Sequence, residues 1–344
     1  MPSSLPVPRI AVVGLGRMGQ LYARILASHP YAHLVAVCDV DATAARTTAA
    51  RVEARAYVDL RELLAHEPVD GVVVAVSDQH HLEPSLAAIE AGKHVFLEKP
   101  VATEIDEARR IASAAAAAGV RLLVGHTLRF DPRYALAQHA IARGEIGDVI
   151  HMYARRIMYR SDGRRLGGRT SLAFFLGVHD IDVVQWFAGC RVRSVYARGR
   201  RHLMADLGVD DTVFSVLAME NGVVASIENS WVLAETQGGR QAPMFEVVGS
   251  EGSIYINPFE SGLSILREDR SRYPDVLYGA DTNATFFGVY RQEMEHFLDC
   301  VAGRSEPLVP VEAALAAVAV AKAVERSLAE GREIAIDWSA WTLR

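Results

Sequence analysis

A glycine-rich turn that directly follows a short apolar run constrains the fold of this chain more than any other feature. The run RIAVVG (9–14) is typical of a buried strand, and apolar residues at helical spacing follow it. Between them lie Gly14, Leu15, Gly16, Arg17, Met18 and Gly19, a GxGxxG pattern in the strand–turn–helix context that dinucleotide binding requires. Gly14 allows the tight turn, Gly16 lets the backbone approach a diphosphate, and Gly19 permits close packing of helix on strand. The N–H groups at the helix start, around Arg17 and Met18, then face the anion.

An acidic residue ends the second apolar strand, LVAVCD (34–39), 20 residues after Gly19. A carboxylate at Asp39 can accept both hydrogen bonds of an adenosine ribose diol, and it repels a 2′-phosphate. The neighbouring Val40 supplies no compensating positive charge. The sequence therefore predicts NAD(H) rather than NADP(H). The simpler alternative is an aspartate that caps the next helix.

Short apolar strands alternate with helical segments through the N-terminal third of the chain. Three more strands follow, GVVVAVS (71–77), KHVFLEKP (93–100) and RLLVG (121–125). Near-continuous apolar strands between helices predict a parallel sheet covered on both faces. We therefore expect a doubly wound Rossmann domain over residues 1–126.

The pattern changes after residue 127 and becomes rich in strands. A helix is predicted over 131–142, a strand over 149–159, then an Arg/Gly-rich loop and a helix over 171–188. The 192–266 segment is mostly strands and holds a hairpin whose Asn221-Gly222 favours a type I′ turn. Helices over 286–301 and 311–328 close the chain. Both faces of TVFSVLAM (212–219) are apolar, so one face should pack on helices and the other meet a second subunit. We assign residues 127–344 to a second, α/β domain.

Composition excludes several classes of protein. The chain has 344 residues, 36 basic and 42 acidic, for a net charge of −6, which argues against nucleic-acid binding. Its three cysteines are far apart and form no metal-binding or disulfide pattern. The first residues do not resemble a signal peptide, and no apolar run is long enough to cross a bilayer. We expect a cytoplasmic protein with no membrane partner.

Lysine is rare in this chain and arginine is common. Lys93, Lys99 and Lys322 are its only lysines. Lys99 follows the fourth of these apolar strands in the sequence Glu98-Lys99-Pro100, where ligands bind in a doubly wound sheet. Lysine can exchange a proton near neutral pH and arginine cannot. Lys99 is therefore a candidate proton carrier or substrate clamp, the alternative being a solvated loop lysine.

The motifs AVVGLGRMG, VVVAVSDQHH, AGKHVFLEKPVA and GVHDID resemble the family of glucose–fructose oxidoreductase and inositol dehydrogenase (Gfo/Idh/MocA). The resemblance implies a Rossmann domain followed by an α/β domain with an open, mostly antiparallel sheet used for homo-dimer or homo-tetramer formation. It also implies sugar or polyol chemistry. Ser77 and His81 would lie beside the dinucleotide, Glu98 would touch the nicotinamide-side ribose, and Lys99 would act on the substrate hydroxyl, with a cis Lys99–Pro100 bond.

The GVHDID motif lies on the helix predicted before the strand-rich region. Residues three apart share a helix face, so His179 and Asp182 should project together, a pair suited to proton exchange at an alcohol or carbonyl. The resemblance makes His179 the catalytic histidine. For Asp182 an orienting or capping role is the alternative. Many family members carry an aspartate four residues before this histidine, where this chain has Phe175.

Arginines crowd the first strand and loop of the second domain, from Arg155 to Arg169. They form either a solvated or inter-subunit surface or a clamp for an anionic substrate. Arg129 and Arg156 are the candidates for the substrate pocket. His80 and His81 have no third ligand at a suitable spacing, so no metal site is predicted.

The sequence thus predicts an NAD-dependent dehydrogenase that moves hydride between the nicotinamide and a secondary carbinol or ketone of a sugar or cyclitol, as inositol 2-dehydrogenases do. One alternative is a dehydrogenase of nucleotide sugars, sugar phosphates or uronates, which the arginines would favour. A second is a non-catalytic, NAD-bound regulatory protein, which Phe175 leaves open.

Overall fold

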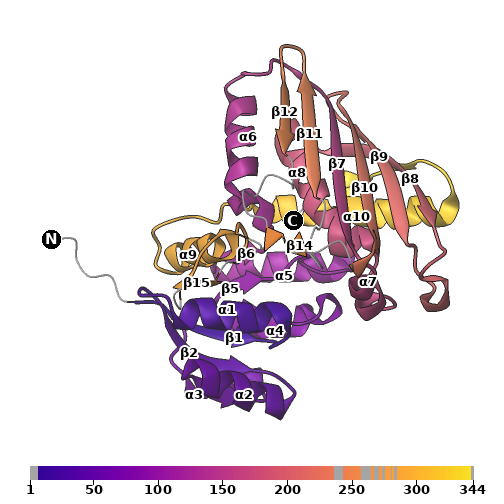
Figure 1. The fold of residues 1–344 in the computed structure, drawn as a ribbon. Helices are drawn as coiled ribbons and strands as arrows, with labels where there is room; N and C mark the ends of the chain where they lie inside the picture. Colours follow the sequence, from indigo (N-terminus) through magenta and orange to yellow (C-terminus); the bar gives the residue numbers. More distant parts are fainter. Residues whose placement is uncertain are drawn as a thin grey trace. The chain divides into compact units, whose positions relative to one another are not determined.

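The chain folds into two compact units. The computed structural model describes residues 7–235, 243–256, 265–266, 271–272, 276–279, 281–282 and 285–341 (Figure 1). The first unit combines the N-terminal residues through 127 with 278–315, and the second combines 128–277 with 316–341. No helix in the described part of the chain is both long enough and apolar enough to cross a membrane.

The first unit is built on a parallel sheet of six strands in the order β3-β2-β1-β4-β5-β6. This is the doubly wound order, which confirms the Rossmann prediction. The strands are β1 (Arg9–Val13), β2 (His33–Cys38), β3 (Arg55–Tyr57), β4 (Gly71–Val74), β5 (His94–Leu97) and β6 (Leu122–Val124). Strand β3 was not predicted from the sequence, because its three residues, Arg, Ala and Tyr, lie at the sheet edge and form no apolar run.

Two layers of helices cover this sheet (Figure 1). The first layer consists of α2, α1 and α9, which contact one another in that order, and the second of α3, α4 and α5. Their bounds are α1 (Arg17–Ala27), α2 (Ala42–Val52), α3 (Leu60–His66), α4 (Leu82–Glu90), α5 (Ile105–Ala118) and α9 (Val289–Val301). Two short pieces, η1 (Asp78–His80) and the β15–β16 pair (Asp281–Thr282 and Thr285–Phe286), belong to the same unit.

Helix α9 belongs to the first unit. The sequence had instead predicted that all residues after 126 form the second domain. The α9 side chain Phe297 packs on the sheet, 5.8 Å from the ring of Phe96 in an edge-on contact. Gly71 in β4 leaves the space that this contact needs, since a Cβ there would lie 3.0 Å from both Phe297 and Val301. The chain therefore returns to the first unit to complete a helical layer.

The second unit is built on a mixed sheet in the order β12-β11-β7-β10-β9-β8-β17. Its pairs are antiparallel except β7 with β10, which agrees with the mostly antiparallel sheet that the resemblance implied. The strands are β7 (Val149–Tyr159), β8 (Val192–Arg200), β9 (Thr212–Met219), β10 (Val224–Leu233), β11 (Met244–Gly249), β12 (Ser253–Ile256) and β17 (Ile334–Ala335). A separate short pair joins β13 (Ile265–Leu266) and β14 (Ser271–Arg272).

The other elements of the second unit are mostly helical. They are η2 (Thr127–Phe130), α6 (Pro132–Ala142), α7 (Arg160–Leu166), the π-helical η3 (Ala173–Gly177), α8 (Val178–Ala188), η4 (Ala205–Leu207), α10 (Val311–Glu330) and η7 (Trp338–Trp341). α10 begins in the stretch assigned to the first unit. The arginine-rich segment predicted as a loop contains the short helix α7. This helix has no apolar periodicity that the sequence could show, and it packs against Trp231 through Gly163.

The hairpin between β9 and β10 does not use a type I′ turn. That turn needs a positive φ at both central residues, and only Gly222 has one, at 90°. Met219 and Val223 bracket a three-residue loop instead, with the Met219 N–H donating to the carbonyl of Val223. The loop length selected the turn, since the pattern of Glu220, Asn221 and Gly222 holds one residue too many for a type I′ connection.

The two faces of the mixed sheet differ in exposure. Helices α8 and α10 lie against one face (Figure 1). Side chains on the strands such as Leu217 and Ile227 are buried. On the other face the strand register places one row of side chains across the sheet, formed by Tyr196, Val216, Ser226, Tyr153, Glu246 and Tyr255. Phe214, beside this row on β9, is 49% exposed. This face is thus apolar and aromatic at its centre without a covering element in the described chain.

Replacing Phe297 tests whether α9 is an integral part of the first unit. Phe297→Ala should lower the free energy of unfolding by about 3–5 kcal/mol, because it leaves a cavity between α9 and the sheet. Phe287→Ala, which removes an exposed ring just before the same helix, should change it by less than about 0.5 kcal/mol. Urea unfolding measures both, and equal losses would contradict the packing described above.

Candidate functional site

The glycine turn between β1 and α1 has the geometry of a diphosphate-binding loop. Gly14 adopts φ +83°, and a Cβ on it would lie 2.6 Å from the backbone nitrogen of Val76. A Cβ on Gly19 would lie 1.7 Å from the carbonyl oxygen of Gly14. Gly16, the residue that starts α1, meets nothing within 4 Å at its Cβ position. The first and third glycines are thus required by packing, whereas the second leaves open space at a helix N-terminus.

The residues that follow Gly16 also fit an anion. Arg17 is exposed and Met18 half-buried in the first turn of α1, and no acidic residue lies in that turn. The positive end of the helix dipole is therefore not neutralised by the chain itself. The start of α1 would therefore suit the diphosphate of a nicotinamide dinucleotide.

Asp39 is held across the mouth of this turn. Its Oδ2 accepts the Leu15 N–H at 2.6 Å, and its Oδ1 accepts the Asp41 N–H at 2.9 Å. The carboxylate is fixed in orientation while each oxygen keeps acceptor capacity for a ribose hydroxyl. The helix-capping alternative does not apply to it, because the cap of α2 is Asp41, which accepts from Thr43 and Ala44.

The loop after β5 carries Lys99 and is anchored on both sides. The Lys99–Pro100 bond is cis, as predicted. His81 is 1% exposed, and its Nδ1 bonds the Pro100 carbonyl oxygen at 2.8 Å, so the side chain supports this loop from below. Burial lowers the pKa of His81, which keeps the ring neutral with one N–H to donate. Ser77 is exposed at the end of the β4 loop, and Lys99 is partly exposed.

Glu98, the residue before Lys99, belongs to a buried acidic cluster that was not predicted from the sequence. The Tyr22 hydroxyl of α1 donates to Glu98 Oε1 at 2.5 Å, and the backbone N–H of Lys99 donates to Oε2 at 3.1 Å. Glu293 of α9 lies on the far side of the same hydroxyl, at 3.5 Å. Burial raises the pKa of Glu98, and the nearby Lys99 charge partly offsets this. The sequence feature that could have indicated this cluster is Glu293 itself, a glutamate at a buried helical position among Tyr290, Met294 and Phe297.

Helix α8 in the second unit carries the GVHDID motif. His179 lies in its first turn and is half-buried. The preceding turn, η3, is π-helical, with the Val178 N–H bonding the carbonyl of Ala173. A π-turn closes i→i+5 hydrogen bonds, so the four-residue spacing does not place Phe175 and His179 on one α-helical face. Single-turn π-helices of this kind are frequent at functional sites.

Asp182 does not have the geometry of a proton carrier. It is 1% exposed, and both of its oxygens accept from the Arg129 guanidinium, at 2.9 and 2.8 Å. Trp186 covers that guanidinium with its ring centroid 5.0 Å away. The expectation that Asp182 exchanges a proton beside His179, and that Arg129 clamps substrate, does not agree with this closed pair. The geometry favours the orienting role for Asp182.

A second arginine–aspartate pair holds the neighbouring residue of the helix. Asp180 is buried and accepts from Arg156 Nε at 3.1 Å and Nη2 at 2.8 Å. The Asn229 side-chain amide donates to the same carboxylate at 3.2 Å. Arg156 is therefore already paired inside the unit, which does not support its assignment as a substrate clamp. The two pairs attach α8 to η2 and to the sheet.

Most of the arginine cluster is similarly engaged within its own chain. Arg164 bonds Asp206, Arg165 bonds Asp162, and Arg160 bonds the Val232 carbonyl. These contacts are exposed and agree with the solvated-surface interpretation rather than with an anion clamp. Within the described ranges no set of three or more His, Cys, Asp or Glu side chains is arranged for a metal ion.

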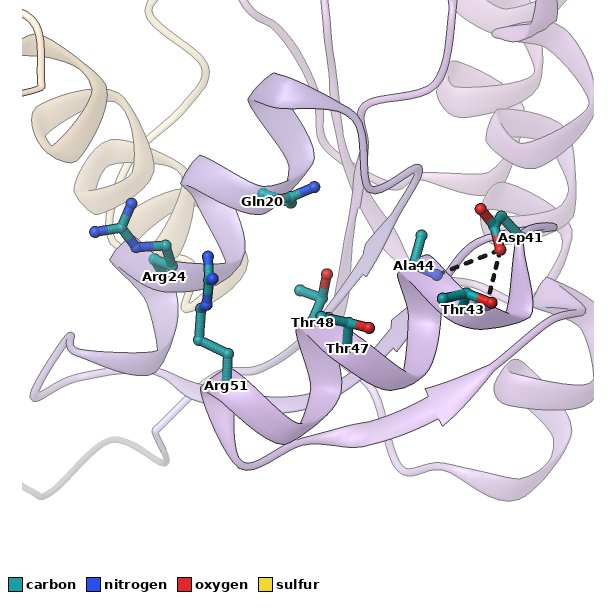
Figure 2. Close-up of a pocket in the computed structure, with 8 residues that line it drawn as sticks. All are labelled: Gln20, Arg24, Asp41, Thr43, Ala44, Thr47, Thr48 and Arg51. Carbon is teal, nitrogen blue, oxygen red and sulfur yellow. Dashed lines mark hydrogen bonds between the residues drawn. The ribbon is translucent and has the colours of Figure 1, made fainter.

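A surface cleft of about 270 Å³ lies between α1 and α2 (Figure 2). Its lining residues are Gln20, Arg24, Asp41, Thr43, Ala44, Thr47, Thr48 and Arg51. None of the residues predicted to bind cofactor or substrate is among them. The predicted cofactor residues lie instead at the carboxyl edge of the parallel sheet, where doubly wound folds bind dinucleotides.

Together, the open glycine turn, the oriented Asp39 and the lysine loop after β5 define a dinucleotide-dependent oxidoreductase. Comparison with known proteins identifies its family. A model described as "Oxidoreductase family, NAD-binding Rossmann fold" matches residues 8–126, and the Gfo/Idh/MocA C-terminal domain model matches residues 134–255. The chain belongs to the Gfo/Idh/MocA family of NAD-dependent oxidoreductases, which confirms the resemblance and the predicted cofactor.

Two of its relatives are named as inositol dehydrogenases. The scyllo-inositol 2-dehydrogenase (NAD(+)) of Bacillus subtilis is 29% identical over 96% of both chains. The inositol 2-dehydrogenase 2 of Saccharopolyspora erythraea is 32% identical, over 94% of this chain and 93% of the relative. The crystal structure of myo-inositol 2-dehydrogenase from Lactobacillus plantarum superposes with a TM-score of 0.85 at 24% identity, covering 96% of this chain and 100% of that one, which shows a shared fold.

Substitutions of two glycines in one turn should affect different properties, NADH binding at Gly16 and stability at Gly19. Gly16→Ala should leave stability unchanged within about 0.5 kcal/mol, because the added methyl meets no atom, yet weaken NADH binding about tenfold by occupying the diphosphate path. Gly19→Ala should destabilise the protein by about 1–3 kcal/mol, because the methyl collides with the Gly14 carbonyl. Thermal unfolding and NADH fluorescence titration separate the two. Tight NADH binding by Gly16→Ala would refute the diphosphate assignment.

Proposed function

We propose that this protein is an NAD-dependent cyclitol dehydrogenase that oxidises a secondary ring hydroxyl of an inositol to the ketone. The supporting observation is that relatives named inositol 2-dehydrogenases match the chain over nearly its whole length. The residues that such chemistry needs, a dinucleotide turn and a lysine in a supported loop, are present in this chain.

In the proposed mechanism each half of the site has a distinct task. Bound NAD supplies the hydride acceptor at nicotinamide C4. Gly16, Arg17 and Met18 bind the diphosphate through the start of α1, and Asp39 accepts from the adenosine ribose hydroxyls. Ser77 lines the dinucleotide, and Glu98 accepts from the nicotinamide-side ribose.

The proton of the substrate hydroxyl is assigned to Lys99 and His179. Lys99 would accept the hydroxyl proton of the substrate, and His179 of α8 is assigned to proton exchange at the alcohol or carbonyl. His81 acts indirectly in this scheme, because its bond to the Pro100 carbonyl fixes the lysine loop. Arg129 and Asp182 likewise act by fixing α8, which carries His179.

Phe175 changes the expected relay, because it cannot accept a proton or orient an imidazole. We infer that the relay runs through Lys99 with ordered water, since both aspartates of the motif are already bonded to arginines. The same pairing leaves no observation in favour of an anionic sugar substrate. A regulatory function is likewise not favoured, because Lys99 and His179 are both retained.

Assembly through the mixed sheet is also proposed, as a homo-dimer or homo-tetramer. The open face carries Phe214, Val216 and Tyr196 close together, at 49%, 46% and 38% exposure. Monomeric proteins rarely expose an apolar patch at the centre of a sheet, and a second copy of the same face is its simplest cover. The surrounding charges of Glu228 and Arg155 can complement one another across a two-fold axis.

The catalytic assignment is tested by replacing the lysine. With NAD and a panel of myo-inositol, scyllo-inositol and aldoses, the wild type should produce NADH fluorescence with at least one inositol. Lys99→Ala should lower kcat/KM by about 10²–10⁴-fold, the contribution of a general base, while the Kd for NADH changes little. Lys93→Ala, a matched substitution before β5, should retain activity. Undiminished turnover by Lys99→Ala would exclude the role, and a panel without response would exclude the substrate class.

The assembly proposal predicts that one charge on the open face dissociates the oligomer. Phe214→Glu should yield monomers in sedimentation equilibrium, since it places a charged carboxylate in the apolar centre of the open face. Tyr31→Glu, at an exposed ring in the first unit, should leave the assembly unchanged. A monomeric wild type, or an intact Phe214→Glu oligomer, would overturn the proposal.

A further inference from the structure

The acidic cluster behind Glu98 contains a carboxyl group whose surroundings do not suit a negative charge. Glu293 is 0% exposed on α9. Its Oε2 lies 3.3 Å from the Thr127 hydroxyl and 3.5 Å from the Tyr22 hydroxyl. Its Oε1 is buried with no hydrogen-bond partner in the described chain. An ionised carboxylate buried in this way would lose most of the hydrogen bonds that it accepts from water when exposed.

Charged groups around Glu293 do not compensate for this burial. Glu98 faces it across Tyr22, so a second negative charge would be repelled. The guanidinium of Arg291, two residues before Glu293 on α9, bonds Glu295 instead, and the His29 ring also lies against Glu295.

Two tyrosines and a lysine of the described chain also lie near the cluster. Tyr290 on α9 contacts the Tyr22 ring. Burial raises the pKa of Tyr22, so its hydroxyl stays neutral near neutral pH. Lys99 lies on the Glu98 side and lowers the pKa of that group. Two carboxyls this close cannot both ionise without a large energetic cost, and the one without cations retains the proton.

We propose that Glu293 is a neutral carboxylic acid that donates through the Tyr22 hydroxyl to Glu98 and thereby positions Glu98 for the nicotinamide-side ribose. In this arrangement the Glu293 O–H donates to the Tyr22 oxygen, and the Tyr22 O–H donates to Glu98. Chained hydrogen bonds polarise one another, so the 2.5 Å bond to Glu98 is strengthened from behind. Glu293 is thus a positioning residue that touches neither cofactor nor substrate. The part of this proposal that concerns the positioning of Glu98 rests on the ribose-binding role proposed above for that residue.

The proton on Glu293 predicts a specific pH dependence of stability. Burial, followed by repulsion from Glu98, raises the pKa of Glu293 well above its ordinary 4.5. The unfolded chain releases this proton above 4.5, whereas the folded chain keeps it, so its stabilising contribution is full below 4.5 and is lost as pH rises toward the folded pKa. In that window the unfolding equilibrium constant of the wild type should rise about tenfold per pH unit relative to that of Glu293→Gln, which binds no proton.

Infrared spectroscopy locates the proton without needing substrate or cofactor. At neutral pH the wild type should show the carbonyl band of a buried protonated acid, shifted in D₂O. The band should disappear in Glu293→Gln and persist in Glu98→Gln, because burial is the main cause of the raised Glu293 pKa. A band lost in Glu98→Gln but kept in Glu293→Gln, or no band in the wild type, would overturn the proposal. So would parallel pH profiles of unfolding.

NADH titration tests the positioning half. Glu293→Gln, whose amide can still donate to Tyr22, should bind NADH with the wild-type Kd, whereas Glu293→Met and Tyr22→Phe should each raise it about fivefold, as expected for one lost hydrogen bond. The double variant should be no weaker than either single one. Glu295→Met, two residues along α9, should bind as the wild type does.

These outcomes separate this proposal from the proposed function. Wild-type Kd values in both Glu293→Met and Tyr22→Phe would overturn the positioning role, and if Glu293→Met does not fold, Tyr22→Phe alone decides it. A wild type that binds NADH but oxidises no inositol would count against the substrate class and leave the infrared result unaffected.

Discussion

The close approach of α1 to the first strand is the constraint on which the rest of the site depends. A methyl group at Gly19 would lie 1.7 Å from the Gly14 carbonyl oxygen, so no other residue lets the helix start at this position. That approach directs the first turn of α1 at the carboxyl edge of the sheet. It also brings the Leu15 N–H to Asp39 and, one turn further on, the Tyr22 hydroxyl to Glu98. A single steric requirement thus sets the positions of both contacts.

Carboxylates in this protein are sorted by the partners that surround them. Asp180 and Asp182 are buried against arginines, and these pairs hold α8. Asp39 accepts backbone N–H groups near the surface. Glu98 and Glu293 lack an arginine partner in the described chain and share a tyrosine hydroxyl. Burial raises the pKa of both members of that last pair.

The sequence predicted the parts of the fold that have a regular period. The five apolar strands, the glycine turn and the two closing helices follow from spacing alone, because burial on two faces and a 3.6-residue repeat leave a direct trace in the residues. The three-residue β3 was missed because it is too short to show a period. The return of α9 to the first unit was missed because packing partners distant in the chain leave no local pattern, even though Gly71 in β4 makes room for them.

Site residues were predictable where chemistry requires a particular residue type, and not where side chains pair. Lys99 was identified because lysine is otherwise avoided, and Asp39 by its distance from the turn. Arginine is used for fixed pairs: Arg129 and Arg156 are each paired with a buried aspartate. Such pairs look the same in sequence as substrate clamps, since both need an arginine near a cleft. The pairing also favours the orienting alternative for Asp182 over proton exchange, because each of its oxygens already accepts a hydrogen bond from Arg129.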